Sequence, residues 1–360
     1  MRLELERRAN PSKLLAFLSP VIALLMTMVT GVLIFAVMGV DPLKGLYAFF
    51  IEPLTEVWSL HELAIKATPI ILIAVGLAVC FRSTNWNIGA EGQFIAGGIV
   101  GSMLPILAPE ANGPWVLPAM MAIGMIGGAL WGLIPALMKT RFGANEILTS
   151  LMLVYIAQLL LDWLVRGIWR NPAGFNFPES RTFTDGQILP ELLMSGRMHY
   201  GALFAVIVVI ATWFMLTRTM KGFEIKVIGQ APRAGAFAGF SAKKMTIFAF
   251  LFSGALAGLA GISEVAGAIQ QLRPVISPGY GFTAIIVAFL GRLNPFGILL
   301  AGLVLALTYL GSEAAQITLG ISDKLGRVFQ GLVLFFVLSC DTLIYFRIKL
   351  VRSLAAKTEA

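Results

Sequence analysis

The chain has 360 residues, of which 58% are hydrophobic and 13% are charged. Soluble domains are closer to half apolar and a quarter charged, so this composition excludes an ordinary water-soluble protein. The formal net charge is +8. In a soluble protein this charge would suggest nucleic-acid binding, but between membrane spans its meaning depends on where Lys and Arg lie.

Apolar stretches of roughly 20 residues, the length that crosses about 30 Å of hydrocarbon, recur along nearly the whole chain. They leave no room for a separate soluble domain, so the sequence predicts one all-α, polytopic membrane domain over residues 14–346. About ten spans are expected: Leu14–Gly39, Glu62–Phe81, Gly89–Leu107, Pro114–Met138, Ile147–Val165, Tyr200–Leu216, Met245–Ala268, Tyr280–Leu290, Pro295–Leu319 and Val328–Phe346.

The termini are both expected in the cytoplasm. Residues 1–13 are charged, and the apolar stretch after them is too long for a signal peptide, so it should remain as a helix. With this orientation, the opposite face of the membrane collects about half as many basic residues. The span at 280–290 is short and is either a crossing helix or a broken, re-entrant one. The positive-inside rule favours crossing, because the basic tail at 347–360 then lies inside.

Two connections are longer than the others. The external loop at 166–199 is rich in Pro, Gly, Asn and charge, and it is expected to form a folded cap or a docking surface. The internal loop at 218–244 carries six basic residues, and Pro232 can begin a short helix there. This helix either inserts into a groove of a partner protein or belongs to a basic loop that touches lipid headgroups. The sequence alone leaves these two readings about equal.

The connection between the second and third spans is unusually polar. Asn85, Asn87, Glu91 and Gln93 would lie at or inside the membrane boundary, where an unpaired carboxylate costs a few kcal/mol. Their amides and the flat ring of Trp86 would suit a hydroxylated ring or a base, so these residues are predicted to line the substrate pathway. The alternative, at even odds, is that they cap helix ends.

Other features point to packing more than to chemistry. Glu264 is a second membrane acid and a weaker pathway candidate, because it lies near the outer end of its span. The cysteines and histidines are isolated, which argues against a disulfide framework, a metal site or a catalytic cluster. Stripes of small residues predict close helix contacts. These stripes are Gly124, Gly128 and Gly132; Gly254 and Gly258; and Ser253, Ala257 and Gly261.

Five motifs keep their order and spacing over roughly residues 62–346 and together resemble the permease subunits of bacterial ABC importers for simple sugars and nucleosides. They are Asn87-Ile-Gly-Ala-Glu-Gly-Gln93, Gly143-Ala-Asn-Glu-Ile147, the loop from Gly229 to Gly239, Ser253-Gly-Ala-Leu-Ala-Gly-Leu-Ala-Gly261, and Gly279-Tyr-Gly-Phe282 leading into Gly291-Arg-Leu-Asn-Pro295. The first motif resembles the nucleoside branch of the family.

The resemblance implies a transporter of several subunits in the bacterial inner membrane. It implies a second permease, identical or paralogous, two cytoplasmic ATPase subunits that bind ATP and Mg, and an external substrate-binding protein, often a lipoprotein. By the same resemblance, Gly229, Pro232, Ala234 and Gly239 belong to the coupling loop that docks in the ATPase. The chain has no Gly-x-x-x-x-Gly-Lys-Ser/Thr phosphate loop, so the energy is expected to come from these partners. Neither the individual substrate nor the import direction follows from the residues themselves.

Two other functions fit parts of the pattern. An ion-coupled secondary transporter would also show ten spans, broken helices and buried acids, with Glu91 or Glu264 as the ion site. A membrane enzyme is less favoured, because no carboxylate pair, histidine cluster or nucleophile and base at a suitable spacing is present. The sequence therefore predicts a non-enzymatic permease.

Overall fold

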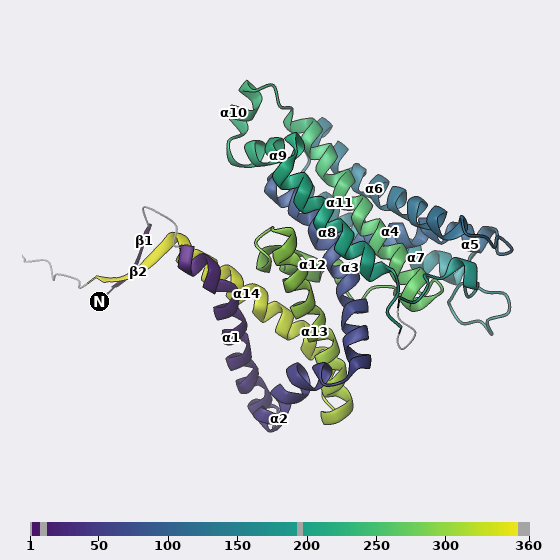
Figure 1. The fold of residues 1–360 in the computed structure, drawn as a ribbon, viewed down its shortest axis with the longest axis horizontal. Helices are drawn as coiled ribbons and strands as arrows, with labels where there is room; N and C mark the ends of the chain where they lie inside the picture. Colours follow the sequence, from purple (N-terminus) through teal and green to yellow (C-terminus); the bar gives the residue numbers. More distant parts are fainter. Residues whose placement is uncertain (1, 8–12, 193–196, 352–360) are drawn as a thin grey trace, which may run out of the picture. The chain divides into compact units, whose positions relative to one another are not determined.

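The computed structural model describes residues 2–7, 13–192 and 197–351, and these residues are almost entirely helical (Figure 1). They divide into two compact units, one formed by residues 53–310 and the other by residues 1–52 together with 311–360. The single domain expected from hydropathy did not distinguish these units. Arg8 and residues 352–360 of the predicted tail lie outside the described residues, as do residues 193–196 of the external loop.

The larger unit contains the helices that surround the polar connection. They are α3 (Val57–Arg82), α4 (Ala90–Gly101), α5 (Met103–Leu107), α6 (Val116–Phe142), α7 (Glu146–Arg166), α8 (Gly201–Arg218), α9 (Met220–Gln230), α10 (Pro232–Phe237), α11 (Ala242–Glu264), the π-helix η4 (Val265–Ile269), α12 (Tyr280–Leu290) and the first part of α13 (Pro295–Leu319). A short 3-10 turn, η3 (Asp185–Gln187), lies in the external loop. Most residues of α3, α4 and α11 are buried, whereas fewer than a third of the residues in the apolar windows of α7 and α8 are buried.

Glycines bring the central helices of this unit into backbone contact. A Cβ atom on Gly128 of α6 would lie 2.2 Å from the Gly254 carbonyl oxygen of α11, and one on Gly258 would lie 2.3 Å from the Gly124 oxygen. Neither distance leaves room for a side chain. The predicted role of these glycines in close helix packing is therefore confirmed, and it matters because lipid provides no hydrophobic force that drives helices together.

The smaller unit is built around aromatic rings. It contains α1 (Lys13–Val37), α2 (Pro42–Leu46), the π-helix η1 (Tyr47–Ile51), the start of the 3-10 turn η2 (Glu52–Leu54), the end of α13 and α14 (Leu325–Tyr345). Phe49 stacks on Phe329 with ring centroids 4.5 Å apart, and Phe35 packs on the same ring at 5.9 Å. All three side chains are fully buried.

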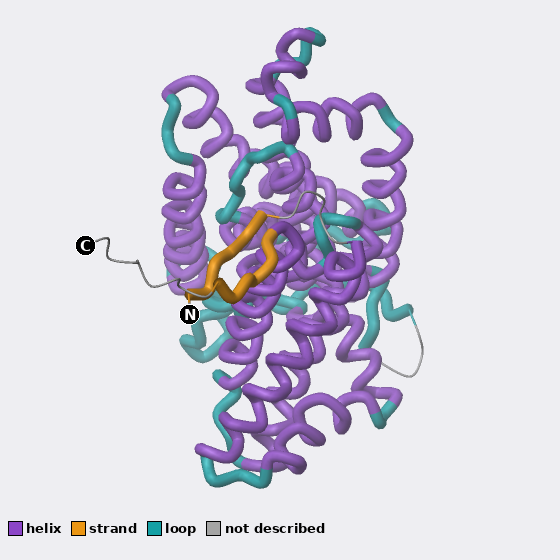
Figure 2. Tube along the Cα trace, turned by 90° about the vertical axis from the view of Figure 1, so that its left-hand side faces the viewer, coloured by secondary structure: helices purple, strands orange, loops and turns teal. Residues whose placement is uncertain are grey.

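A two-stranded antiparallel ribbon in the smaller unit was not predicted. Strand β1 (Arg2–Arg7) pairs with β2 (Phe346–Val351), so that Arg2 lies opposite Val351 and Arg7 opposite Phe346 (Figure 2). Sequence reasoning treated these segments as charged tails, because each is short and its partner lies at the other end of the chain. The ribbon places the two terminal segments side by side.

The membrane spans agree with the predicted helices. Within the described residues, eight helices are long and apolar enough to cross a membrane, and Tyr280–Leu290 and Leu325–Cys340 are shorter apolar helices. The ten predicted stretches thus correspond to eight full-length spans and two short ones. At about 1.5 Å per residue, the eleven residues of α12 extend only about 16 Å, roughly half the hydrocarbon thickness.

Candidate functional site

The connection between α3 and α4 turns back into the membrane domain. The Asn87 side chain donates a hydrogen bond to the hydroxyl of Ser253, 3.1 Å away. Ser253 lies eleven residues after Ala242, the first residue of α11, which corresponds to about 16 Å of helix rise. Asn87 therefore contacts α11 well inside that helix rather than at its end, and α4 begins three residues after Asn87.

Two amides close this connection by pairing with each other. Asn87 donates to the Gln93 Oε1 atom at 3.0 Å, and Gln93 donates back to the Asn87 Oδ1 atom at 3.1 Å. The Gly89 N–H donates to the same Oδ1 atom. Asn87 is fully buried and Gln93 is 1% exposed. Because buried polar groups need partners, this pair stabilises irregular backbone inside the membrane domain.

Asn85 joins four helices at the end of the bundle where α3 and α6 end and α7 and α11 begin. Its Oδ1 atom accepts hydrogen bonds from the ammonium of Lys139 at 3.0 Å and from the hydroxyl of Thr246 at 2.9 Å. Lys139 also forms a salt bridge with Glu146. These partners lie on α6, α11 and α7, while Asn85 follows the end of α3. Its buried amide therefore connects the segments that flank the polar connection.

Trp86 is the most exposed of the predicted pathway residues, with 42% of its surface accessible. Its ring lies 5.4 Å from Phe81 and is stacked at 6.3 Å from Phe289, near the end of α12. The Trp86 ring, which the sequence analysis predicted to contact a substrate ring, thus already contacts two aromatic side chains of the protein.

Glu91 caps the half-length helix α12. Its Oε2 atom accepts a hydrogen bond of 2.6 Å from the N–H of Gly281, in the first turn of the helix. Gly279, at a φ of 109°, turns the chain into α12, and the Ser277 hydroxyl accepts the N–H groups of Gly279 and Tyr280. A carboxylate at a helix N-terminus is favourable because the free N–H groups carry partial positive charge. Glu91 is 2% exposed, and the bond with Gly281 gives its buried carboxylate a hydrogen-bond partner.

A cavity of about 440 Å³ lies beside Glu91, within the range of small-molecule sites. It is lined by Glu91 and Ile95 of α4; Gln158, Leu159, Leu161, Asp162 and Arg166 of α7; and Pro274, Val275, Ile276 and Ser277. None of these described lining residues is aromatic. The cavity combines apolar walls with amide, carboxylate, guanidinium and hydroxyl groups.

The polar wall of this cavity comes from one exposed face of α7. The Nε atom of Arg166 donates to both carboxylate oxygens of Asp162, at 2.7 and 2.8 Å. Gln158 precedes Asp162 by one helical turn and lines the same cavity. None of Gln158, Asp162 and Arg166 was among the predicted pathway residues. The sequence signal that could have identified them is their spacing of four residues, which places Gln158, Asp162 and Arg166 on one face of a helix.

Glu264 is separated from this region. It lies eleven residues beyond Ser253, about 16 Å along the helix, and is the last residue of α11. It is 7% exposed, its charged neighbours are Glu62, Lys66 and Arg197, and its Oε2 atom has no hydrogen-bond partner among the described residues. Asn85, Asn87 and Gln93 therefore lie in or beside the polar connection between α3 and α4, whereas Glu264 lies apart from it. The predicted pathway roles of all these residues stay predictions.

The internal loop forms two short helices, of which α10 begins at Pro232. Gly235 of α10 is buried close to Val227 and Ile228 of α9, whereas Phe237 is fully exposed. Gly239 ends the segment with a φ of 82°. The tip of the loop thus presents an apolar ring with no contact partner in the described part of the chain.

The described part of the loop at 166–199 is hydrogen-bonded to other connections of the larger unit. The Ser180 and Phe183 N–H groups donate to the carbonyls of Leu272 and Gln270, and the Gln187 side chain donates to the carbonyls of Pro109 and Ala111. These bonds connect the loop to the segment after η4 and to the connection between α5 and α6.

Apolar helices of spanning length, a half-length helix and a polar cavity define a polytopic membrane transport protein. Residues 59–338 match the family model described as "Branched-chain amino acid transport system / permease component", and the chain belongs to this family. It is therefore a multi-pass, non-enzymatic permease subunit of the ABC transporter class in the cell membrane. This membership excludes the ion-coupled secondary transporter considered above.

Curated relatives match nearly the full chain. The glucose ABC transporter permease protein TsgB13 of Haloferax volcanii is 35% identical, covering 95% of this chain and 92% of the relative. The nucleoside ABC transporter permease protein NupB of Lactococcus lactis is 29% identical and covers 89% and 90%, respectively. The guanosine ABC transporter permease protein NupP of Bacillus subtilis is also 29% identical and covers 89% and 93%.

Proposed function

We propose that this permease carries a hydroxylated sugar ring, either as a simple sugar or as the ribose of a nucleoside. The observation that carries the proposal is the cavity beside Glu91, whose α7 wall offers an amide, a carboxylate and a guanidinium to ligand hydroxyls. Its relatives are named for glucose, nucleosides and guanosine, which share such hydroxyls. The non-aromatic lining of this cavity supports recognition through the sugar rather than through stacking on a base.

Within this cavity we assign different roles to the acids. Gln158 is exposed and Asp162 is partly exposed on α7, and both contact substrate hydroxyls, while Arg166 orients the Asp162 carboxylate. Glu91 shapes the cavity by holding the start of α12. The buried amides Asn87 and Gln93 support the backbone behind it.

In this proposal, the internal loop couples ATP hydrolysis by the partner subunits to movement of the helices around the cavity. Two cytoplasmic ATPase subunits bind ATP and Mg, and α10 inserts its exposed Phe237 into a groove of one of them. A second permease, identical or paralogous, completes the pathway, and an external substrate-binding protein docks on the loop at 166–199. The exposed rings of Phe175 and Phe177 on that loop support such a docking surface.

The proposed topology places both termini in the cytoplasm. The pairing of β1 with β2 supports this arrangement, because paired terminal segments lie on the same side of the membrane. The excess of basic residues on that side supports it as well.

The test is uptake of radiolabelled glucose, ribose, guanosine and uridine by cells that carry or lack the gene. We expect gene-dependent uptake that survives an uncoupler and stops when ATP is depleted, with free ribose or glucose as a competitor. Uptake that an unglycosylated base inhibits better than any sugar would contradict recognition through hydroxyls. Uptake that depends on the ion gradient alone would contradict coupling to ATPases.

A further inference from the structure

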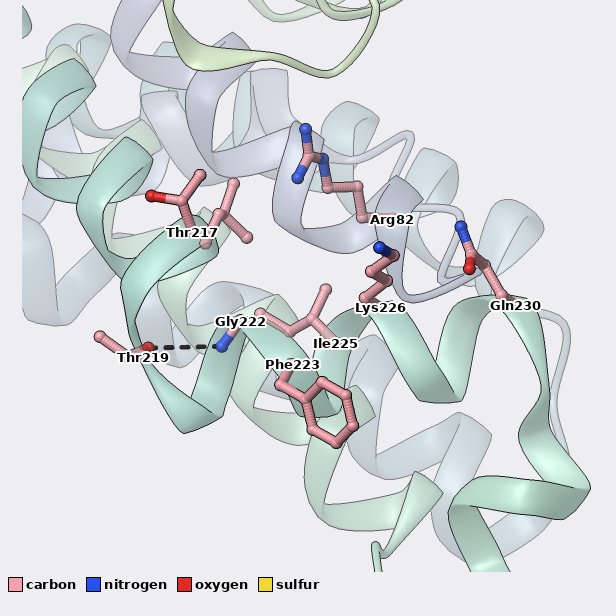
Figure 3. A pocket seen from close by; sticks show the side chains of 9 residues that line it. Arg82, Thr217, Thr219, Gly222, Phe223, Ile225, Lys226 and Gln230 are labelled. Carbon is pink, nitrogen blue, oxygen red and sulfur yellow. Dashed lines mark hydrogen bonds between the residues drawn. The ribbon is translucent and has the colours of Figure 1, made fainter.

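A second cavity, of about 560 Å³, lies away from the proposed pathway, where α3 and α8 end and α9 begins (Figure 3). Its walls combine basic, polar and apolar groups. The lining residues are Arg82, Leu216, Thr217, Thr219, Gly222, Phe223, Ile225, Lys226 and Gln230.

Two positive charges in this cavity lack a counter-charge. Arg82 of α3 and Lys226 of α9 both line it, and the side chain of neither forms a hydrogen bond or ion pair with any described residue (Figure 3). None of the described lining residues is acidic. Glu224, on the same helix as Lys226, already pairs with Lys221 at 2.8 Å.

Backbone contacts fix the position of α9 beside this cavity. A Cβ atom on Gly229 would lie 1.9 Å from the carbonyl oxygen of Arg82, and one on Gly222 would lie 2.4 Å from that of Leu216. The Gly222 N–H also donates to the Thr219 hydroxyl at 3.3 Å. Only glycine allows these close approaches, so Gly222 and Gly229 determine the spacing between α3, α8 and α9.

The chemistry of the cavity matches an anionic amphiphile. The guanidinium of Arg82 can form paired hydrogen bonds with phosphate oxygens, and the ammonium of Lys226 adds a second positive charge. Leu216 and Phe223 offer apolar surface beside these charges. On the proposed topology, the cavity lies at the cytoplasmic membrane surface, where basic pockets between helices bind anionic headgroups.

We propose that this cavity binds the phosphate of an anionic phospholipid from the cytoplasmic leaflet, held between Arg82 and Lys226. The inference rests on the proposed topology but not on the proposed substrate. A bound lipid would connect the end of α3 to α9, the helix that precedes the proposed coupling helix α10.

The experiment measures which lipids stay bound to the complete transporter. The assembly is reconstituted in vesicles with equal amounts of phosphatidylglycerol and phosphatidylcholine, released into mild detergent, and analysed by native mass spectrometry. We expect the wild-type transporter to retain phosphatidylglycerol preferentially. Excess inorganic phosphate should not displace it, because phosphate alone lacks the apolar contacts.

The variant Arg82→Gln/Lys226→Gln removes both charges, and Arg141→Gln/Lys243→Gln is the matched control with exposed cytoplasmic residues outside the cavity. A hydrogen bond to a charged group contributes about a tenfold preference or more, so the cavity variant, which loses both groups that would hold the headgroup, should lose at least about tenfold of the phosphatidylglycerol preference. The control should retain it. The charge-preserving variant Arg82→Lys/Lys226→Arg should also retain most of it, which separates the loss of charge from a folding defect.

Three results would overturn the proposal. They are equal retention of both lipids by the wild type, the same loss in the matched control, and displacement of the lipid by inorganic phosphate, which would assign the site to a soluble anion. Because retention is measured without transport, these results do not depend on whether the proposed substrate is correct.

Discussion

Replacing Glu91 distinguishes a helix cap from a substrate ligand. In Glu91→Ala, the buried N–H of Gly281 loses its acceptor, which costs about 1–3 kcal/mol. The start of α12 also loses a negative charge, which contributes about 0.3–1 kcal/mol and up to about 2 kcal/mol in buried geometry. The free energy of unfolding should therefore fall by about 2–4 kcal/mol. Glu91→Gln keeps an acceptor oxygen and should lose only about 1 kcal/mol.

Unfolding by SDS titration in mixed micelles measures these losses, and uptake by the same variants measures transport. We expect Glu91→Gln to transport at close to the wild-type rate, because the cap remains. The control is Asp162→Asn, whose partly exposed ion pair with Arg166 is worth about 0.3–0.5 kcal/mol. This control should keep its stability but raise KM about tenfold, since it loses a charged hydrogen bond to the substrate. A stable Glu91→Gln protein without uptake would refute the capping argument.

Three further predictions concern packing, pH and coupling. Gly128→Leu should destabilise the protein by at least about 3 kcal/mol in SDS titration, because its side chain would overlap the backbone of α11, whereas Gly331→Ala, with open space around it, should change stability little. Burial, with repulsion from Arg197, lowers the pKa of His199 to about 4, and the imidazole Nδ1 atom accepts the Gly201 N–H. Stability should therefore fall by up to about 3 kcal/mol as the pH drops from 6.5 towards 4, in unfolding titrations at stepped pH, and His199→Gln should flatten this loss. Phe237→Ala should leave stability unchanged but reduce substrate-stimulated ATP hydrolysis by the assembled transporter at least tenfold; unchanged hydrolysis would argue against α10 as the coupling element.

The helical spans were predictable because hydropathy is a local property. Each apolar stretch has to satisfy its backbone within itself, so its length and composition indicate a helix without knowledge of its neighbours. The glycine contacts followed from spacing in the same way: Gly254 and Gly258 lie on one helix face, as do Gly124 and Gly128.

The candidate site was harder to predict because its contacts join distant parts of the sequence. Glu91 meets Gly281 across 190 residues, and Asn87 meets Ser253 across 166. The sequence marked these polar residues as unusual but could not decide whether their partners were ligands or protein. The cavity wall on α7 was missed because Asp162 and Arg166 satisfy each other, and an ion pair near a span end has the same pattern as an interface anchor.

The most direct test of the central claim is ATP-dependent transport by the purified transporter, assembled with its partner subunits in sealed proteoliposomes without an ion gradient. The account predicts that labelled glucose or a ribonucleoside is transported when ATP is supplied to the cytoplasmic face, and that Asp162→Asn raises the KM for this substrate. Transport that proceeds without ATP and follows an imposed ion gradient would contradict it.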